Sequence, residues 1–94
     1  MKRITELNER IKLKEDLACE KLKHISSLLK YQYSINNTYE INKNEYSIII
    51  EEEEVFVNHT YDIDKLLKID VDMETRIIRG AFCMCIARII SGIV

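Results

Sequence analysis

The segment from Met73 to Val94 constrains the fold more than any other part of this chain. After Glu74 it contains no acidic residue, and its large side chains are almost all apolar. These apolar residues are Ile77, Ile78, Phe82, Met84, Ile86, Ile89, Ile90, Ile93 and Val94. A helix this apolar must be covered over most of its surface, and a domain of this size has only a modest core with which to cover it. The sequence therefore predicts self-association or a partner.

Length and composition indicate one well-folded domain, residues 1–94. The chain has 94 residues, of which 47% are hydrophobic and 32% charged. Proline is absent, and glycine occurs only at Gly80 and Gly92. This composition favours long regular elements and excludes the glycine-rich loops that bind phosphate.

Charge is unevenly distributed along the chain. Residues 1–36 carry a net charge of +3, residues 37–74 of −8 and residues 75–94 of +3. Three cysteines and a charged N-terminal sequence without an apolar signal segment favour a reducing, cytoplasmic location. Arg79 and Arg88 interrupt the C-terminal apolar stretch, so we expect it to be buried in protein and not in a membrane.

Residues 3–33 are predicted to form a helix, because apolar residues recur every three or four positions from Ile4 to Leu29. About thirty helical residues would span roughly 45 Å, whereas a compact domain of this length has a radius of gyration of roughly 13 Å. We therefore expect the helix either to break near Lys14-Glu15 or to project and pair with another helix. Asn36-Asn37 is the predicted stop signal.

Residues 38–61 change to a strand pattern. Segments 38–41 and 46–50 are rich in β-branched and aromatic residues, and residues 42–45 are a plausible hairpin turn. Val55 begins a third candidate strand, with Val57, His59 and Tyr61 on the same face. The turn chemistry around Glu52-Glu53 is poor, so one long bent strand over residues 46–58 is the alternative.

Aspartates mark the starts of two further helices. Asp62 precedes a short helical turn, and either Asp70 or Asp72 is expected to cap the final helix. Gly80 within that helix predicts the close approach of another backbone. The predicted fold class is therefore α+β, with a long N-terminal helix, a small antiparallel hairpin or three-stranded sheet, and an apolar C-terminal helix.

No catalytic or cofactor-binding arrangement is recognisable, and we expect neither enzyme activity, a cofactor nor a metal site. Cys83 and Cys85 point about 200° apart on a helix, so they cannot grip one ion, and buried apolar packing is the expected role of these thiols. Cys19 and His24 also diverge. His59 lies near acidic residues in sequence, but a general base needs a fixed third group and a pocket.

The run Glu51, Glu52, Glu53 and Glu54 is the most conspicuous polar feature. With Asp62, Asp64, Asp70 and Asp72 it could present carboxylates to a basic protein surface, such as the groove of a nucleic-acid-binding protein. The alternative is a solvated hairpin end or a charged strand edge that prevents aggregation. Direct binding of nucleic acid by this chain is disfavoured, because basic residues on the first helix alternate with acidic ones.

Arg76 and Arg79 suggest a second hypothesis. They share one side of the final helix, and in an oligomer they could bind an anionic nucleotide. The alternative is that both arginines pair with the acidic middle segment. A third hypothesis is a structural or regulatory homo-oligomer without a ligand.

In size, acidity and absence of catalytic groups, the chain resembles small phage-encoded inhibitors of bacterial defence systems, anti-CRISPR proteins among them. The likeness concerns the class and assigns no residue a role. The leading prediction is a non-enzymatic inhibitor that blocks a macromolecular partner through its acidic surface and forms homo-oligomers.

Overall fold

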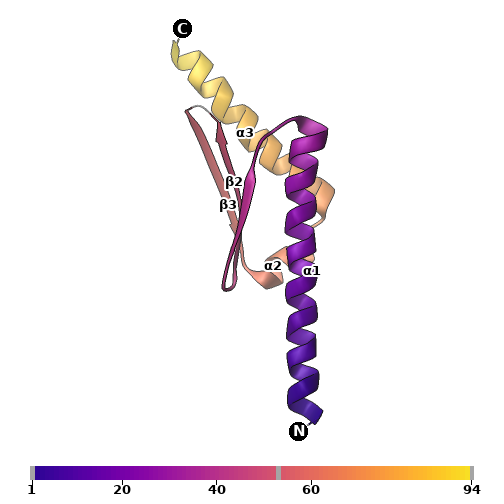
Figure 1. Ribbon diagram of the computed structural model, residues 1–94. Coiled ribbons are helices and arrows are strands. Elements are labelled where there is room, and N and C mark those ends of the chain that lie inside the picture. Colours follow the sequence, from indigo (N-terminus) through magenta and orange to yellow (C-terminus); the bar gives the residue numbers. More distant parts are fainter. Residues whose placement is uncertain (1, 53, 94) are drawn as a thin grey trace.

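The computed structural model describes residues 2–52 and 54–93, and the side chains of residues 8–52 and 54–90. Six elements follow one another along the chain (Figure 1). They are α1 (Lys2–Tyr33), β1 (Thr38–Asn42), β2 (Glu45–Glu52), β3 (Val55–Tyr61), α2 (Ile63–Lys68) and α3 (Val71–Ile93). The predicted α+β class is confirmed, and β2 and β3 are separate strands, which excludes the alternative of one bent strand.

Helix α1 is continuous over 32 residues and does not break at Lys14-Glu15. Helix α1 extends the molecule at one end and α3 at the other (Figure 1). The extents are 66 × 22 × 17 Å and the radius of gyration is 16.2 Å. The apolar stripe of α1 reaches the core only from Ala18 onward, whereas Ile11, on the same stripe, is 52% exposed. The N-terminal half of α1 therefore projects beyond the sheet.

Helix α1 ends at Tyr33, as predicted, but Asn36-Asn37 is not its stop signal. Ser34, with φ of 57°, takes the left-handed conformation, and the Ile35 amide donates to the Leu29 carbonyl at 2.8 Å. Asn37 has another role, because its side-chain amide donates to the Ser26 carbonyl at 3.0 Å and to the Ile35 carbonyl at 3.1 Å. These bonds hold the connection between α1 and β1 against the helix.

The sheet is antiparallel in the order β1-β2-β3, with one face against the helices. A two-residue turn joins β1 to β2 as predicted, with Lys43 at φ of 56°. Burial alternates along β2 and β3, as expected when only one face is covered. The predicted face of β3 is confirmed, since Val55, Val57 and Tyr61 are buried and His59 is half-buried.

Aspartates begin α2 and α3 as predicted. Asp62 Oδ1 accepts the Lys65 amide at 2.7 Å, and Asp70, not Asp72, accepts the Met73 amide at 3.0 Å. Lys21 of α1 closes the end of α2, because its Nζ donates to the carbonyls of Leu67 and Ile69 at 2.6 and 2.8 Å. A positive charge at this end also complements the helix dipole.

The core lies between α1, α3 and the inner face of the sheet. Fully buried side chains come from α1 (Leu22, Ile25, Leu29), β2 (Ile48, Ile50), α2 (Leu66) and α3 (Ile78). The buried Thr75 hydroxyl donates to the Val71 carbonyl at 2.7 Å, so this polar group is satisfied. Within residues 2–52 and 54–93, no helix has the length and apolar character required to cross a membrane.

Candidate functional site

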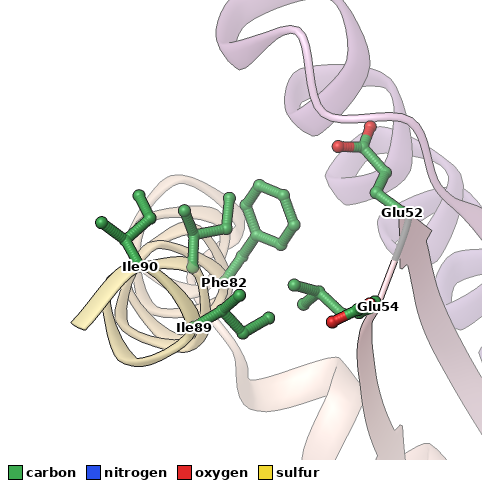
Figure 2. Close-up of a pocket in the computed structure, with 7 residues that line it drawn as sticks. Glu52, Glu54, Phe82, Ile89 and Ile90 are labelled. Atoms are coloured by element: carbon green, nitrogen blue, oxygen red, sulfur yellow. The ribbon is translucent and has the colours of Figure 1, made fainter. Parts of the chain in front are cut away.

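A groove of about 550 Å³ separates the turn end of β2 and β3 from the C-terminal half of α3. Figure 2 shows glutamates of the sheet end facing apolar side chains of α3 across this space. We call it the β-turn groove, and its described lining residues are Glu52, Glu54, Val55, Phe82, Ile86, Ile89 and Ile90. Every described side chain that lines it is therefore apolar or acidic.

The geometry of the groove follows from two local patterns. Glu52 pairs with Val55 across the β2–β3 ladder, and Val55 belongs to the inner face of β3, so Glu52 also lies on the side toward α3. Phe82, Ile86 and Ile89 lie three to four residues apart, so they share the face of α3 that packs toward the sheet. An apolar floor thus meets carboxylates at its edge.

The four consecutive glutamates do not form one surface. Glu51 pairs with Phe56 on the outer face of the sheet, whereas Glu52 and Glu54 border the groove. Glu53 was predicted to contribute to partner binding, and it lies outside the described residues. Glu52 also has a structural contact, because its Oε1 accepts the Asn36 amide at 3.2 Å.

Asp62 and Asp64, which were also predicted to contribute to partner binding, lie at the opposite end of the sheet from Glu54. Strand β3 runs from Val55 to Tyr61 between the two sites, and seven extended residues span roughly 23 Å. Asp62 is moreover occupied as the cap of α2. A partner segment bound in the groove can therefore contact Glu54 without contacting Asp62 or Asp64.

Arg76 and Arg79 are both exposed near the end of α1. The Arg79 guanidinium lies over the Tyr33 ring, 4.7 Å from its centroid, and Arg76 borders a cleft of about 180 Å³ with Gln32, Asp72 and Thr75. This volume is below the range of roughly 300–1,000 Å³ common for ligand pockets, and the Asp72 carboxylate would repel a phosphate. The nucleotide hypothesis gains no support from this cleft, and a pocket shared between subunits stays untested.

The thiols and imidazoles do not converge on a reactive site. Cys83 is exposed, which contradicts the expectation that it is a buried apolar group, whereas Cys85 packs against the core. His24 is exposed and His59 is half-buried. Among the residues described, no group of three or more histidine, cysteine or acidic side chains is placed to hold a metal ion.

The outer face of α3 is uncovered by the chain itself, as the sequence predicted. Met73, Ile77 and Met84 are all more than half exposed. Among the described residues, no other segment makes the close backbone approach predicted at Gly80, because a Cβ atom built there would meet nothing within 4 Å beyond its own part of α3. The self-association predicted from this face stays a prediction.

Comparison of the chain with protein-family models, curated proteins and solved structures found no significant match. Function must therefore be argued from the geometry alone. Sequence reasoning selected Glu52 and Glu54 but missed their neighbours in the groove, since Phe82, Ile86 and Ile89 follow the pattern of ordinary core residues. Only the fold brings these two segments together.

Proposed function

We propose that the protein is a non-enzymatic binding protein whose β-turn groove takes a basic, amphipathic segment of a partner protein. The observation that carries the proposal is the position of Glu52 and Glu54 beside the apolar side chains of α3 (Figure 2). An apolar side chain of the partner would enter between Phe82 and Ile89. A lysine or arginine next to it would meet the carboxylates.

Charge and burial both support this class of partner. Exposed carboxylates steer a cationic segment toward the groove, and apolar contact then contributes most of the affinity. Ile90 is 58% exposed at the groove, so a bound segment would remove apolar surface that the chain leaves in water. The groove thus combines attraction at long range with burial at short range.

Blocking such a partner would make the protein an inhibitor. Basic amphipathic segments are common on surfaces that bind nucleic acid, where lysine and arginine contact phosphates. A chain that covers such a surface would compete with nucleic acid without binding it. The resemblance in size and acidity to phage-encoded counter-defence proteins fits this role, which we propose for the chain.

Selection of peptides provides a test that does not require the partner in advance. The immobilised protein would be panned against a library of random 12-residue peptides displayed on phage. We expect the selected peptides to place an apolar residue next to lysine or arginine. In ¹⁵N-labelled protein, they should shift the amide resonances of Val55, Ile86 and Ile89. Selection of no peptide, or of peptides without basic residues, would overturn the proposal.

A pair of double variants tests the role of charge. E52Q/E54Q removes both carboxylates and keeps an oxygen on residue 52 for the Asn36 amide. E40Q/E45Q makes the same change at exposed positions of β1 and β2, away from the groove. We expect the first variant to weaken peptide binding about tenfold, less so at 0.5 M salt, and the second to leave it unchanged. Equal affinity of both variants would refute the role of the carboxylates. Equally tight binding of a simple alkylammonium ion would assign the groove to small ligands instead.

A further inference from the structure

The outer face of α3 carries an apolar stripe that the proposed function does not use. Its members are Met73, Ile77, Gly80, Met84 and Ala87. They are spaced alternately by four and three residues, which is the repeat of a helix that packs along another helix. Ile77 is 52% and Met84 60% exposed. At 100° per residue, the stripe lies opposite the buried face that holds Ile78 and Phe82.

Gly80 lies at the middle of this stripe, and no contact among the described residues requires a glycine there. Glycine in a helix interior costs about 1 kcal/mol relative to alanine. Apart from its chain neighbours and the adjacent backbone of α3, no described atom lies within 4 Å of a Cβ built at this position, so packing among the described residues does not require glycine. The lack of a side chain matters where a second helix crosses close to the backbone.

The charges on α3 indicate that the second helix is α3 of another copy of this chain, in antiparallel orientation. The first turn contains Asp72 and Glu74 and follows Asp70, whereas the second half carries Arg88 and, through residue 90, no acidic residue. Asp72 precedes Gly80 by eight residues and Arg88 follows it by eight, so each lies about 12 Å from Gly80 along the axis. An antiparallel copy crossing at Gly80 therefore brings its Arg88 beside this acidic turn.

We propose that two copies of this chain dimerise through the stripe on α3, with the helices antiparallel and crossing at Gly80. A parallel pair would place the two acidic turns together and the two Arg88 side chains together, and it would align the helix dipoles unfavourably. The antiparallel pair reverses both effects. The β-turn groove lies toward the opposite face of α3, so dimerisation leaves it open and does not depend on the proposed function.

The size of the dimer interface indicates the range in which the dissociation constant of the dimer should lie. From Met73 to Ala87 the stripe extends about 21 Å along the axis. One helix pair of this length falls at the small end of specific interfaces, below roughly 1,200 Å² in total. We therefore expect a dissociation constant in the micromolar range, and sedimentation equilibrium should cover about 1 to 200 µM.

Gly80→Gln is the main test, with Ser27→Gln as the matched control. Both substitutions place the same neutral side chain at an exposed helix position, and Ser27 lies on α1. We expect the wild type and S27Q to dimerise with rising concentration and G80Q to stay monomeric. At 1 µM the G80Q monomer should melt at a higher temperature than the wild type, because glutamine favours helix more than glycine. That increase shows that the loss of dimer is not a loss of fold. A monomeric wild type at 200 µM, or a G80Q dimer of unchanged affinity, would overturn the proposal.

Spin labels distinguish the two orientations. The native cysteines would be replaced (C19S, C83S, C85A), and a label would be attached at Ile90→Cys, which lies outside both the stripe and the charged turn. The antiparallel dimer places the two labels about 30 Å apart along the axis, whereas a parallel dimer in register places them roughly one interhelical distance apart, about 10 Å. A single short distance would overturn the antiparallel arrangement. R88Q should weaken the antiparallel dimer, and an unchanged affinity would contradict the charge argument.

Discussion

The Tyr61 hydroxyl donates a hydrogen bond of 2.5 Å to Glu74 Oε1 and so joins the end of β3 to the first turn of α3. Tyr61 is only 4% exposed. Burial, and then the hydrogen bond to Glu74 and its negative charge, raise the pKa of Tyr61 far above its ordinary value of 10.0. This pair links the first turn of α3 to the end of the sheet opposite the β-turn groove.

Tyr61→Phe should reduce the free energy of unfolding at pH 7 by about 1.5 kcal/mol, because it removes a hydrogen bond to a charged group. In the wild type, the unfolded chain loses the Tyr61 proton near pH 10 while the folded chain keeps it, so stability falls as pH rises above that value. The variant has no proton to lose and should show a shallower decline. Urea unfolding from pH 7 to 11 measures both effects. Equal alkaline slopes for the two proteins would contradict the assignment.

Lys21→Met should destabilise the fold by roughly 1.5–3 kcal/mol. The substitution removes a charged donor from two carbonyl groups at the end of α2 and keeps an unbranched side chain of nearly the same length. Lys23→Met is the control, since Lys23 is exposed two residues further along α1. Its effect should stay within about 0.5 kcal/mol. Thermal and urea unfolding of both variants decide the matter, and equal effects would mean that the Lys21 contacts contribute nothing.

The two halves of α1 should respond differently to the same kind of truncation. Leu22 is fully buried, so Leu22→Ala should cost about 2–5 kcal/mol. Ile11 lies on the same apolar stripe but is half exposed, and Ile11→Ala should cost less than about 1 kcal/mol. Urea unfolding at low micromolar concentration measures both. A large cost at Ile11 would show that another molecule covers the projecting half of α1.

Cys83 should react with a thiol reagent faster than Cys19 or Cys85. Its side chain is exposed, whereas the other two are half-buried. Brief treatment with iodoacetamide at low protein concentration, followed by peptide mass spectrometry, would give the order of modification. The C83S variant should lack the fast phase. Fastest modification at Cys85 would contradict the described orientation of α3.

Much of the fold could be predicted because it depends on local patterns. The switch from helical to alternating periodicity located the sheet. Asp62 identified the start of α2, and the start of α3 was predicted at Asp70 or Asp72, of which Asp70 is the cap. The end of α1 at Tyr33 was predicted, but the residue that ends it was not, because Ser34, not an asparagine, takes the left-handed conformation. Serine is a weak sequence signal for a left-handed residue that ends a helix. The residue after it, Ile35, is buried, so packing of Ile35 in the core favours the chain reversal at Ser34.

The candidate site could be predicted only in part. Sequence reasoning treated residues 51–54 as one acidic surface, but the alternation of β2 directs Glu51 and Glu52 to opposite faces. The register of β2 with β3, which decides which glutamate faces α3, depends on a turn without clear turn chemistry. Glu52 and Phe82 line the same groove from segments thirty residues apart, and no local pattern in either segment encodes this arrangement.

The start of α1 and the end of α3 lie at opposite ends of the long axis (Figure 1). This separation decides how the chain should be tethered or tagged. A fusion placed ahead of α1 stands well away from the sheet and leaves α3 accessible from both sides. A fusion placed after α3 would lie close to the β-turn groove and to the apolar stripe on α3. It would obstruct binding at both surfaces, so a binding assay with such a fusion would give a false negative result.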